Sequence, residues 1–304
     1  MLESIFTFLK KFLSSLFTFL KILIRSNLFI AKVAPVEYKS CIILGNGPSL
    51  KNVLSEHLSS LSSQILWTVN KFPATEYYTV LKPAYFLFVA SGYYKSESIK
   101  HEQDTRDEII DALITKTTWN IIVFCPNESK RYPSFISRLN SNKFIKIVFF
   151  NKTPVEGLEI FNNFFYRFAW GMPRPHNVLI PAIIQAINMG YKEINVVGAD
   201  HSWLPLISVN YKNEALINQQ HFYQDKEGSN GKMYRNSVPR RLHEILEKLM
   251  LSFRSYFELE NYAKSRGINI YNCTPNSFID SFERKDLKSV FSEKRQIIES
   301  YLQK

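Results

Sequence analysis

The run Ser40-Cys-Ile-Ile-Leu-Gly-Asn-Gly-Pro-Ser-Leu50 constrains the fold of this 304-residue chain more than any other segment. Four apolar residues, Cys41 to Leu44, end at a glycine-rich turn, and a helix is expected to begin near Ser49. A buried strand that leads through such a turn into a helix is typical of nucleotide-binding α/β domains. The turn would present backbone N–H groups to a phosphate, and the helix N-terminus would add partial positive charge.

Glycine at positions 45 and 47 would let a ligand approach the backbone closely and would also permit a positive φ. The spacing is neither a Walker A loop nor a complete G-x-G-x-x-G fingerprint, and no lysine stands at the P-loop position. A strand-to-helix turn without any ligand is therefore the alternative interpretation.

The rest of the chain alternates between strand-like and helix-like segments. Strands are expected at 41–45, 65–69, 85–89, 120–125, 146–150, 193–198 and 268–272. Helices are expected at 49–61, 104–115, 177–189 and 240–265. This alternation predicts one α/β domain over 38–304, with a Rossmann-like, doubly wound and mostly parallel sheet. The polar stretch 204–238 is too long for an ordinary connection, so we expect it to form a lid or substrate loop.

Charge limits the partners that this chain can have. The sequence contains 38 Lys and Arg against 27 Asp and Glu, a net charge of +11, so an anionic partner or surface is expected. Nucleic acid is the weakest candidate, because no RRM, KH, zinc-finger or basic-zipper signature is present. The three cysteines, Cys41, Cys125 and Cys273, show no C-x-x-C spacing and are expected to be reduced core thiols of a cytosolic protein.

Residues 1–33 are expected to form an amphipathic helix outside this domain. Over 2–24 the apolar residues follow the 3.6-residue period of a helix. The polar face is basic and carries Lys10, Lys11, Lys21 and Arg25. The lysines make this run a poor transmembrane span, and no signal-peptide cleavage site follows it.

A Phe- and Leu-rich face beside basic residues favours a helix that lies on an anionic membrane. We therefore expect peripheral localisation at the cytoplasmic face of the inner membrane. Packing of this helix on the protein's own core, or a contact between subunits of a homo-oligomer, is the alternative.

In doubly wound sheets, ligands bind beyond the carboxyl ends of the strands. That rule brings together five segments that are distant in sequence: Gly45–Ser49, Asn70, Ala90–Ser91, Asp200–Trp203 and Thr274–Ser277. Three longer motifs contain most of them: Gly45-Asn-Gly-Pro-Ser-Leu, Met189-Gly-Tyr-Lys-Glu-Ile-Asn-Val-Val-Gly-Ala-Asp200 and Ile270-Tyr-Asn-Cys-Thr-Pro-Asn-Ser277.

In this order, with Asn70 after the second strand, these motifs resemble the bacterial sialyltransferases of glycosyltransferase family 42. They also resemble the wider group that contains the motility-associated flagellin glycosyltransferases and the archaeal hydroxymethylpterin diphosphokinase-like proteins. The resemblance covers residues 38 to 285 in scattered motifs and leaves out the amphipathic arm.

The resemblance implies a sialyltransferase-like variant of the GT-A fold with a partly mobile lid, and an inverting transferase that uses a CMP-activated nonulosonic acid without a metal. The glycine-rich turn would face the nucleotide and its phosphate, and the turn at 276–277 would hold cytidine. The family's Arg-x-Thr-Ser stretch corresponds loosely to Arg174-Pro-His-Asn177. The donor-binding candidates carried over by position are Gly45, Asn46, Gly47, Ser49, Asn70, Arg174, Asn177, Asn276 and Ser277.

Independently of the resemblance, the chain contains no D-x-D motif, the usual metal-diphosphate signature of UDP-sugar enzymes. A CMP-sugar has one phosphate, so protein cations can take the place of a metal. We therefore expect no metal and no other cofactor. The expected partners are a nucleotide-sugar donor, carrying sialic acid, another nonulosonic acid or Kdo, and a glycan or glycolipid acceptor.

Inverting sugar transfer requires a general base for the acceptor hydroxyl and groups that help the phosphate to leave. The candidate bases are His221, in the expected lid, and then His201, at a strand end. Tyr223 is the candidate hydroxyl donor to the phosphate, and Asp200 is the candidate carboxylate for donor or acceptor. An Asp–His hydrogen bond is the structural alternative for His201, and a helix cap is the alternative for Asp200.

Of the remaining histidines, His57 and His101 stand in polar surroundings and are expected to be solvated. His176, beside Arg174, suits either a phosphate contact or a turn.

Two other functions stay open. A pterin or nucleotide diphosphokinase would need ATP, Mg²⁺ and paired carboxylates, of which only Asp200 is well placed. A non-catalytic nucleotide-binding protein of the membrane surface would depend on the N-terminal arm rather than on the histidines.

Overall fold

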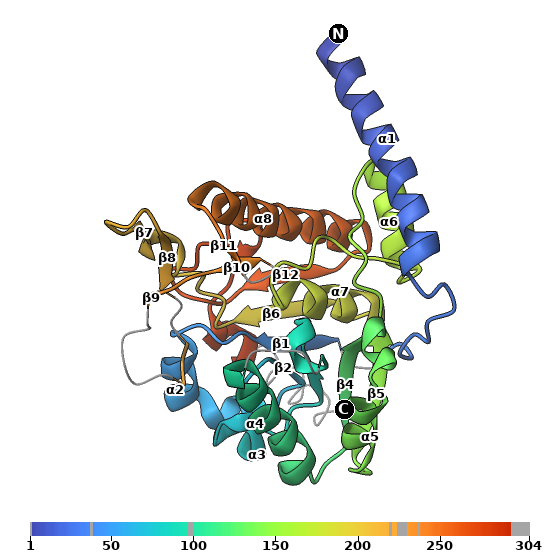
Figure 1. Ribbon diagram of the computed structural model, residues 1–304. Helices are drawn as coiled ribbons and strands as arrows, with labels where there is room; N and C mark the ends of the chain where they lie inside the picture. The colour runs from blue at the N-terminus through green and yellow to red at the C-terminus, as the bar shows by residue number, and fades with distance from the viewer. Residues whose placement is uncertain are drawn as a thin grey trace.

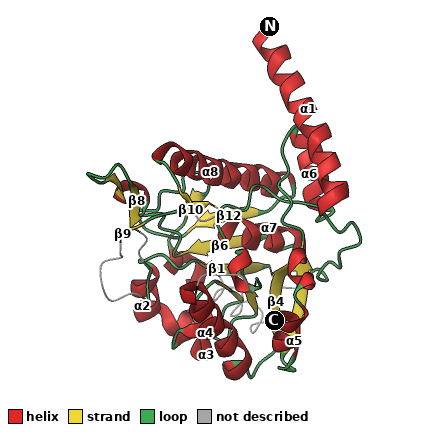
Figure 2. Ribbon diagram, viewed as in Figure 1, coloured by secondary structure: helices red, strands yellow, loops and turns green. Residues whose placement is uncertain are grey.

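The computed structural model describes residues 2–36, 39–95, 100–218, 221–223, 230–235 and 238–292. Its centre is a sheet of eight strands in the order β13-β12-β6-β1-β2-β3-β4-β5, and every pairing in it is parallel. Helices cover both faces of the sheet (Figures 1 and 2). The predicted α/β fold, Rossmann-like and doubly wound, is confirmed.

The strands of this sheet are β1 (Ser40–Leu44), β2 (Leu66–Val69), β3 (Tyr85–Leu87), β4 (Ile121–Pro126), β5 (Ile145–Phe150), β6 (Glu193–Val197), β12 (Asn269–Asn272) and β13 (Glu283–Arg284). The helices are α1 (Leu2–Arg25), α2 (Leu50–Ser62), α3 (Tyr77–Leu81), α4 (Lys100–Lys116), α5 (Pro133–Asn140), α6 (Glu159–Arg167), α7 (Leu179–Met189) and α8 (Leu242–Ser265). Every predicted strand and helix is present. The sequence pattern missed the short helices α3, α5 and α6 and the two-residue strand β13, because elements this short give little periodicity.

The alternation of side chains along β1 divides the core into two layers. Ile42 and Leu44 join an apolar cluster with helices α2 to α5. Cys41 and Ile43 point the other way, into a cluster with α7 and α8. All three cysteines are buried and free, as the sequence predicts for core thiols.

The direction of strand addition reverses at β1. The chain first adds β2 to β5 on one side of it and then returns to place β6, β12 and β13 on the other. Strands β1 and β6 pair in register along their length, from Ser40 opposite Glu193 to Leu44 opposite Val197. The carboxyl ends of β1 and β6 therefore form the topological switch point, where open α/β sheets bind their ligands.

The predicted lid contains a small antiparallel sheet and a hairpin. The sheet consists of β7 (Ile207–Val209), β8 (Ala215–Asn218) and β9 (Asn230–Gly231), and the hairpin pairs β10 (Tyr234–Arg235) with β11 (Val238–Pro239). Residues 219–220, 224–229 and 236–237 of the predicted lid lie outside the described part of the chain. Ala215 packs on Ile245 and Leu249 of α8. Movement of this insertion stays a prediction.

Helix α1 has the predicted amphipathic pattern but ends at Arg25 rather than at residue 33, and it meets the body through small polar side chains together with Ile22. The Thr18 hydroxyl donates to the backbone oxygen of Glu156 (2.8 Å) and accepts from the N–H of the same residue (3.1 Å). The Ser15 hydroxyl accepts from the N–H of Leu158 (2.9 Å). Ile22 is buried, whereas every other Leu, Ile and Phe from 5 to 24 is at least 39 % exposed. The alternative in which the helix packs on the protein's own core holds in part, because Ile22 joins the core while most of the apolar face stays uncovered.

Within the described residues, no helix combines the length and the apolar character needed to cross a membrane.

We predict that Gly157→Ala will detach α1 from the body. Gly157 has a φ of +135°, and a Cβ there would lie 2.1 Å from the Ser15 hydroxyl and 2.7 Å from the Ser15 nitrogen. The clash and the strained φ should lower the free energy of unfolding by about 1–3 kcal/mol. They should also speed tryptic cleavage within 25–36 by about tenfold, because local opening exposes that segment.

The matched control is Gly190→Ala, where φ is +92° but nothing lies within 4 Å of the added Cβ. It should cost stability without speeding this cleavage. Equal cleavage of the two variants would contradict the contact between α1 and the loop at Gly157.

Candidate functional site

The turns that follow β1 and β6 are packed against each other at the switch point. The Gly45 N–H donates to the Val197 oxygen (2.7 Å), and the Gly47 N–H donates to the Gly198 oxygen (2.8 Å). A Cβ on Gly45 would lie 2.5 Å from the Gly198 oxygen, and one on Gly47 would lie 2.0 Å from Oδ2 of Asp200. Glycine is required at both positions because the neighbouring turn leaves no room for a side chain.

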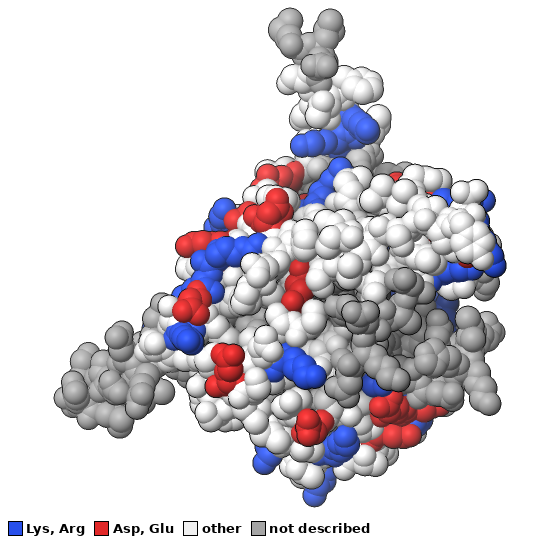
Figure 3. Space-filling model, turned by 90° about the vertical axis from the view of Figure 1, so that its left-hand side faces the viewer, with Lys and Arg blue, Asp and Glu red and all other residues white. Residues whose placement is uncertain are grey.

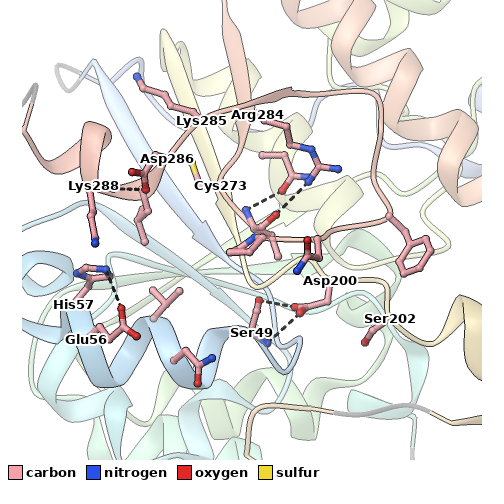
Figure 4. Close-up of a pocket in the computed structure, with 18 residues that line it drawn as sticks. Ser49, Glu56, His57, Asp200, Ser202, Cys273, Arg284, Lys285, Asp286 and Lys288 are labelled. Carbon is pink, nitrogen blue, oxygen red and sulfur yellow. Dashed lines mark hydrogen bonds and ion pairs between the residues drawn. The ribbon is translucent and has the colours of Figure 1, made fainter.

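The N–H groups of Gly45 and Gly47, which are expected from the sequence to face a phosphate, bond within the protein in this structure. Neither Gly45 nor Gly47 has a positive φ, and both N–H groups bond to the turn after β6. Ser49 donates its N–H to Oδ1 of Asp200 (3.1 Å) and its hydroxyl to Oδ2 (2.8 Å) (Figure 4). The carboxylate of Asp200 thus lies at the N-terminus of α2, where the helix dipole stabilises an anion.

Asp200 is therefore a cap, but for α2 rather than for a helix that follows it. The residue is 9 % exposed. Burial raises the pKa of its carboxyl above the usual value, and the hydrogen bonds from Ser49 oppose that shift. A buried carboxylate held at a switch point is a candidate functional group.

The turn after β12 is hydrogen-bonded to the turn after β6. The Ala199 N–H donates to the Thr274 hydroxyl (3.0 Å), and the Ser277 hydroxyl donates to the Ala199 oxygen (2.6 Å). The predicted cytidine ligand Ser277 thus has its hydroxyl engaged within the protein. Asn276 lies exposed at the tip of the turn, with a φ of +53°. The guanidinium of Arg284 donates to the backbone oxygens of this turn, at Thr274, Ser277 and Ile279.

A cavity of about 1070 Å³ opens between α2 and the turn after β12, with Asp200 in its wall (Figure 4). Ligand pockets generally measure about 300–1,000 Å³, so it is large enough for a nucleotide sugar. Its polar lining residues are Ser49, Asn52, Glu56, His57, Asp200, Ser202, Asn272, Thr274, Asn276, Arg284, Lys285, Asp286 and Lys288. Of these, Ser49, Asp200 and Asn276 were predicted site residues.

The prediction that His57 is solvated is wrong. Helix α2 loses helical geometry at this residue (φ −128°, ψ 19°), and the side chain is 19 % exposed. Its Nε2 lies 3.8 Å from Oε2 of Glu56, and its ring lies 5.6 Å from the ring of Phe291. Sequence reasoning had no signal for this kink. The side chain of the other such histidine, His101, lies outside the described part of the structure.

A second, smaller pocket of about 90 Å³ lies on the other side of Asp200. Eight predicted site residues line it, namely Gly45, Asn46, Gly47, Asn70, Asn177, Asp200, His201 and His221. They come from three strand ends, a helix start and the insertion, and the switch point brings them together. In this state the pocket is too small for a nucleotide sugar.

His221 reaches the switch point from the insertion. Its Nδ1 lies 3.3 Å from the backbone oxygen of Asn46, which also accepts from the N–H of Phe222 (3.2 Å). The His221 ring stacks on the ring of Tyr223, 5.1 Å away. Burial lowers the pKa of His221, so the imidazole is neutral at pH 7 and able to accept a proton. Burial raises the pKa of Tyr223, which therefore keeps its proton.

His201 belongs to an aromatic cluster. Its Nε2 lies 2.9 Å from the hydroxyl of Tyr256, and its ring packs against Trp203 and Phe253. Tyr256, rather than Asp200, is its hydrogen-bond partner. The residue is 5 % exposed, and burial lowers the pKa of His201 to about 4.

Arg174 and Asn177 make local contacts. The guanidinium of Arg174 forms a two-point ion pair with the carboxylate of Glu156, at 2.5 and 2.9 Å. Arg174 lines neither cavity, so its assignment to the donor site is not supported. Asn177 lines the smaller pocket, and its Oδ1 also accepts from the N–H of Leu179 at the start of α7 (2.9 Å).

Comparison with known proteins extends only to distant structural likeness. No family model matches the chain. No curated protein matches its sequence. Among solved structures, the chain is similar to the MAf glycosyltransferase from Magnetospirillum magneticum, with a TM-score of 0.47 and 11 % sequence identity. The match covers 89 % of this chain and spans 38 % of that protein's length. A likeness this distant assigns no activity and no residue role.

Acid should destabilise the protein through His201. Its pKa is about 4 in the folded protein and about 6.5 in the unfolded chain, so between these values the unfolded chain binds more protons. The stability that comes from neutral His201 is complete above pH 6.5 and is lost as the pH falls toward 4, by up to about 3 kcal/mol. Urea denaturation at several pH values across this range measures the slope of the free energy of unfolding against pH.

His201→Asn should flatten that slope, and asparagine tolerates the positive φ of 54° at this position. His243→Asn, at an exposed histidine of α8, is the control and should leave the slope unchanged. A wild-type slope in the His201→Asn variant would show that this histidine is not the buried neutral group described here.

Proposed function

We propose that this chain is an inverting glycosyltransferase that takes a CMP-activated sugar at the switch point and needs no metal. The observation that carries the proposal is the cavity beside Asp200, which lies beyond the carboxyl ends of β1, β6 and β12 and has the volume of a nucleotide-sugar site. The motif resemblance supports a CMP-sugar as donor, with sialic acid, another nonulosonic acid or Kdo as the sugar. The acceptor would be a lipid-linked or surface glycan.

Two groups at the switch point are suited to a nucleoside. The carboxylate of Asp200 can accept hydrogen bonds from ribose hydroxyls, and the exposed amide of Asn276 can pair with a base or a hydroxyl. On the other side of Asp200, the amide oxygen of Asn46 is buried and has no donor among the described residues. A ligand N–H or O–H group would satisfy it.

The phosphate is placed away from the N-terminus of α2 in this proposal, because the carboxylate of Asp200 is already there. A second anion at that point would be repelled. The wall formed by residues 284–288 offers cations instead, among them Lys288, whose side chain lines the cavity (Figure 4). One phosphate requires less neutralisation than a diphosphate, and this favours CMP over UDP as the leaving group.

His221 is the proposed general base. As the acceptor oxygen attacks the anomeric carbon opposite the phosphate, the neutral imidazole takes the hydroxyl proton. The bond from the anomeric carbon to the phosphate oxygen breaks, and CMP leaves with the electron pair. Tyr223 lines neither cavity and lies beside Lys71, so we assign this predicted phosphate donor no contact with the departing phosphate. His201 is less suited to this role, because its ring is enclosed and its Nε2 is engaged with Tyr256.

Peripheral attachment to the cytoplasmic face of the inner membrane is part of the proposal, through the basic and apolar helix α1. Among the described residues, no group of three or more His, Cys, Asp or Glu side chains is arranged to hold a metal ion. Metal independence is a prediction that the next experiment tests.

CMP should raise the thermal midpoint of the protein by several degrees in the presence of EDTA, and UDP and GDP should not. Ligand at a hundred times its Kd contributes about 2.7 kcal/mol of stability.

Asn276→Ala should weaken CMP binding by about tenfold, because one hydrogen bond to the ligand is lost. Asn140→Ala, at an exposed asparagine that ends α5, is the matched control.

Stabilisation by a UDP-sugar with Mn²⁺, and none by CMP, would refute the proposed donor. Stabilisation and turnover with ATP and Mg²⁺ would instead support the diphosphokinase alternative.

His221→Gln should lower kcat for sugar transfer by about 10²–10⁴, the usual contribution of a general base, while CMP still raises the thermal midpoint. His243→Gln is the control and should transfer sugar at the wild-type rate. An unchanged rate in His221→Gln would remove this histidine from the mechanism. A function that survives substitution of His221 and His201 but is lost on deletion of residues 1–33 would favour a non-catalytic protein, whereas an enzyme should show the opposite with a soluble acceptor in detergent.

A further inference from the structure

Helices α1 and α6 together expose a continuous apolar surface. The two helices lie side by side over the C-terminal half of α1 (Figures 1 and 2), and the rings of Phe19 and Phe165 stack between them at 6.5 Å. The outer side of α6 presents Ile160, Phe161 and Phe164, and Ile160 is 75 % exposed. Soluble monomers rarely expose apolar patches of this extent, and those that do use them for contact with a partner or a membrane.

The opposite side of α1 fixes this orientation. Ser15, Thr18 and Ile22 recur at helical spacing and face the body, where the two hydroxyls satisfy backbone groups of 156–158. After the helix, Asn27 and Asn151 exchange two hydrogen bonds of 2.9 Å between backbone and side chain. Rotating α1 to bury its apolar face would break these bonds and leave backbone groups unsatisfied. The apolar face is therefore directed outward.

Residues 4–13 of α1 extend beyond the body and are exposed on every side. A helical end of this length is marginal in water when nothing packs on it. Because its outer face is rich in Phe and Leu, this helical end would be stabilised by apolar surroundings rather than by solvent.

Cations border the apolar surface without acidic neighbours on the same segment. Between Ser4 and Lys32 the sequence has five Lys or Arg (Lys10, Lys11, Lys21, Arg25 and Lys32) and no Asp or Glu. In Figure 3 the projection at the top is white and blue below its grey tip, and red atoms appear where it meets the body. An anionic surface is complementary to this segment.

We propose that the surface formed by α1 and α6 docks on an anionic lipid bilayer, with the Phe and Leu side chains at headgroup depth and the lysines on phosphates. This deepens the attachment through α1 that is part of the proposed function, by adding α6 and naming anionic lipid as the partner, and it uses none of the residues of the donor site. A second copy is the less suitable occupant, because two-fold pairing would bring the cations of both copies together. The Nζ of Lys21 lies 3.9 Å from Oε2 of Glu156 on the body, so lipid headgroups would attract the other cations of this segment, each contributing about 1 kcal/mol at the membrane surface.

Flotation of the full-length chain with vesicles tests the proposal. Binding to vesicles of phosphatidylcholine with about one third phosphatidylglycerol should exceed binding to phosphatidylcholine alone by about tenfold and should weaken with salt. Phe17→Glu with Ile24→Glu, on α1, should lower the bound fraction about tenfold, because a charge is costly at this depth. Phe161→Glu, on α6, should lower it as well, which only a two-helix surface predicts.

The matched control for the glutamates is Val80→Glu, at a residue of α3 that is 53 % exposed and lies on the body. Lys10→Gln with Lys11→Gln should remove the preference for phosphatidylglycerol, whereas Lys143→Gln with Lys146→Gln, near the start of β5, should not. All substituted side chains are exposed, so each variant should keep the wild-type thermal midpoint.

Wild-type binding by the Phe161→Glu variant would overturn the part of the proposal that concerns α6. Failure of the wild-type chain to float with either vesicle, together with a dimer that Phe17→Glu with Ile24→Glu dissociates, would identify a subunit interface and overturn the proposal as a whole. The shift of thermal midpoint by CMP, measured on the same samples, separates these outcomes from a failure of the donor site.

Discussion

The close packing of the turns after β1 and β6 is the constraint on which the candidate site depends. Gly45 and Gly47 have no room for side chains because Gly198 and Asp200 lie against them. This contact carries the carboxylate of Asp200 to the N-terminus of α2 and ties the ends of β1, β6 and β12 into one rim. Asp200 consequently lies in the walls of both cavities, between the large cleft and the small pocket beneath the insertion.

That arrangement has an electrostatic cost and a chemical consequence. Burial raises the pKa of Asp200, so the ionised carboxylate is held at the expense of stability, as is common at functional sites. The carboxylate of Asp200 already lies at the N-terminus of α2, and we therefore propose that the phosphate of the donor does not bind in the turn after β1. A single phosphate bound farther out, against the basic wall at 284–288, fits this geometry better than a diphosphate bound in the turn.

The hydrophobic pattern was sufficient to predict a mostly parallel sheet and the succession of strands and helices along the chain, because buried strands appear as short apolar runs. It also predicted that residues as distant as Asn46, Asn70 and Asp200 would meet, since parallel strands share a carboxyl edge. It could not predict the partners of individual groups. That Ser49 bonds to Asp200, that Arg174 pairs with Glu156, and which side of α1 meets the body are settled by tertiary contacts.

A crystal structure with CMP bound is the most direct test of the central claim, that Asp200 excludes phosphate from the turn after β1 and directs the nucleotide into the adjoining cavity. We predict that the nucleoside will contact Asp200 or Asn276 and that the phosphate will lie toward Lys288, with both hydrogen bonds from Ser49 to Asp200 intact. A phosphate bonded to the N–H groups of residues 45–49, with Asp200 displaced, would contradict the account, as would a nucleotide bound outside this cavity.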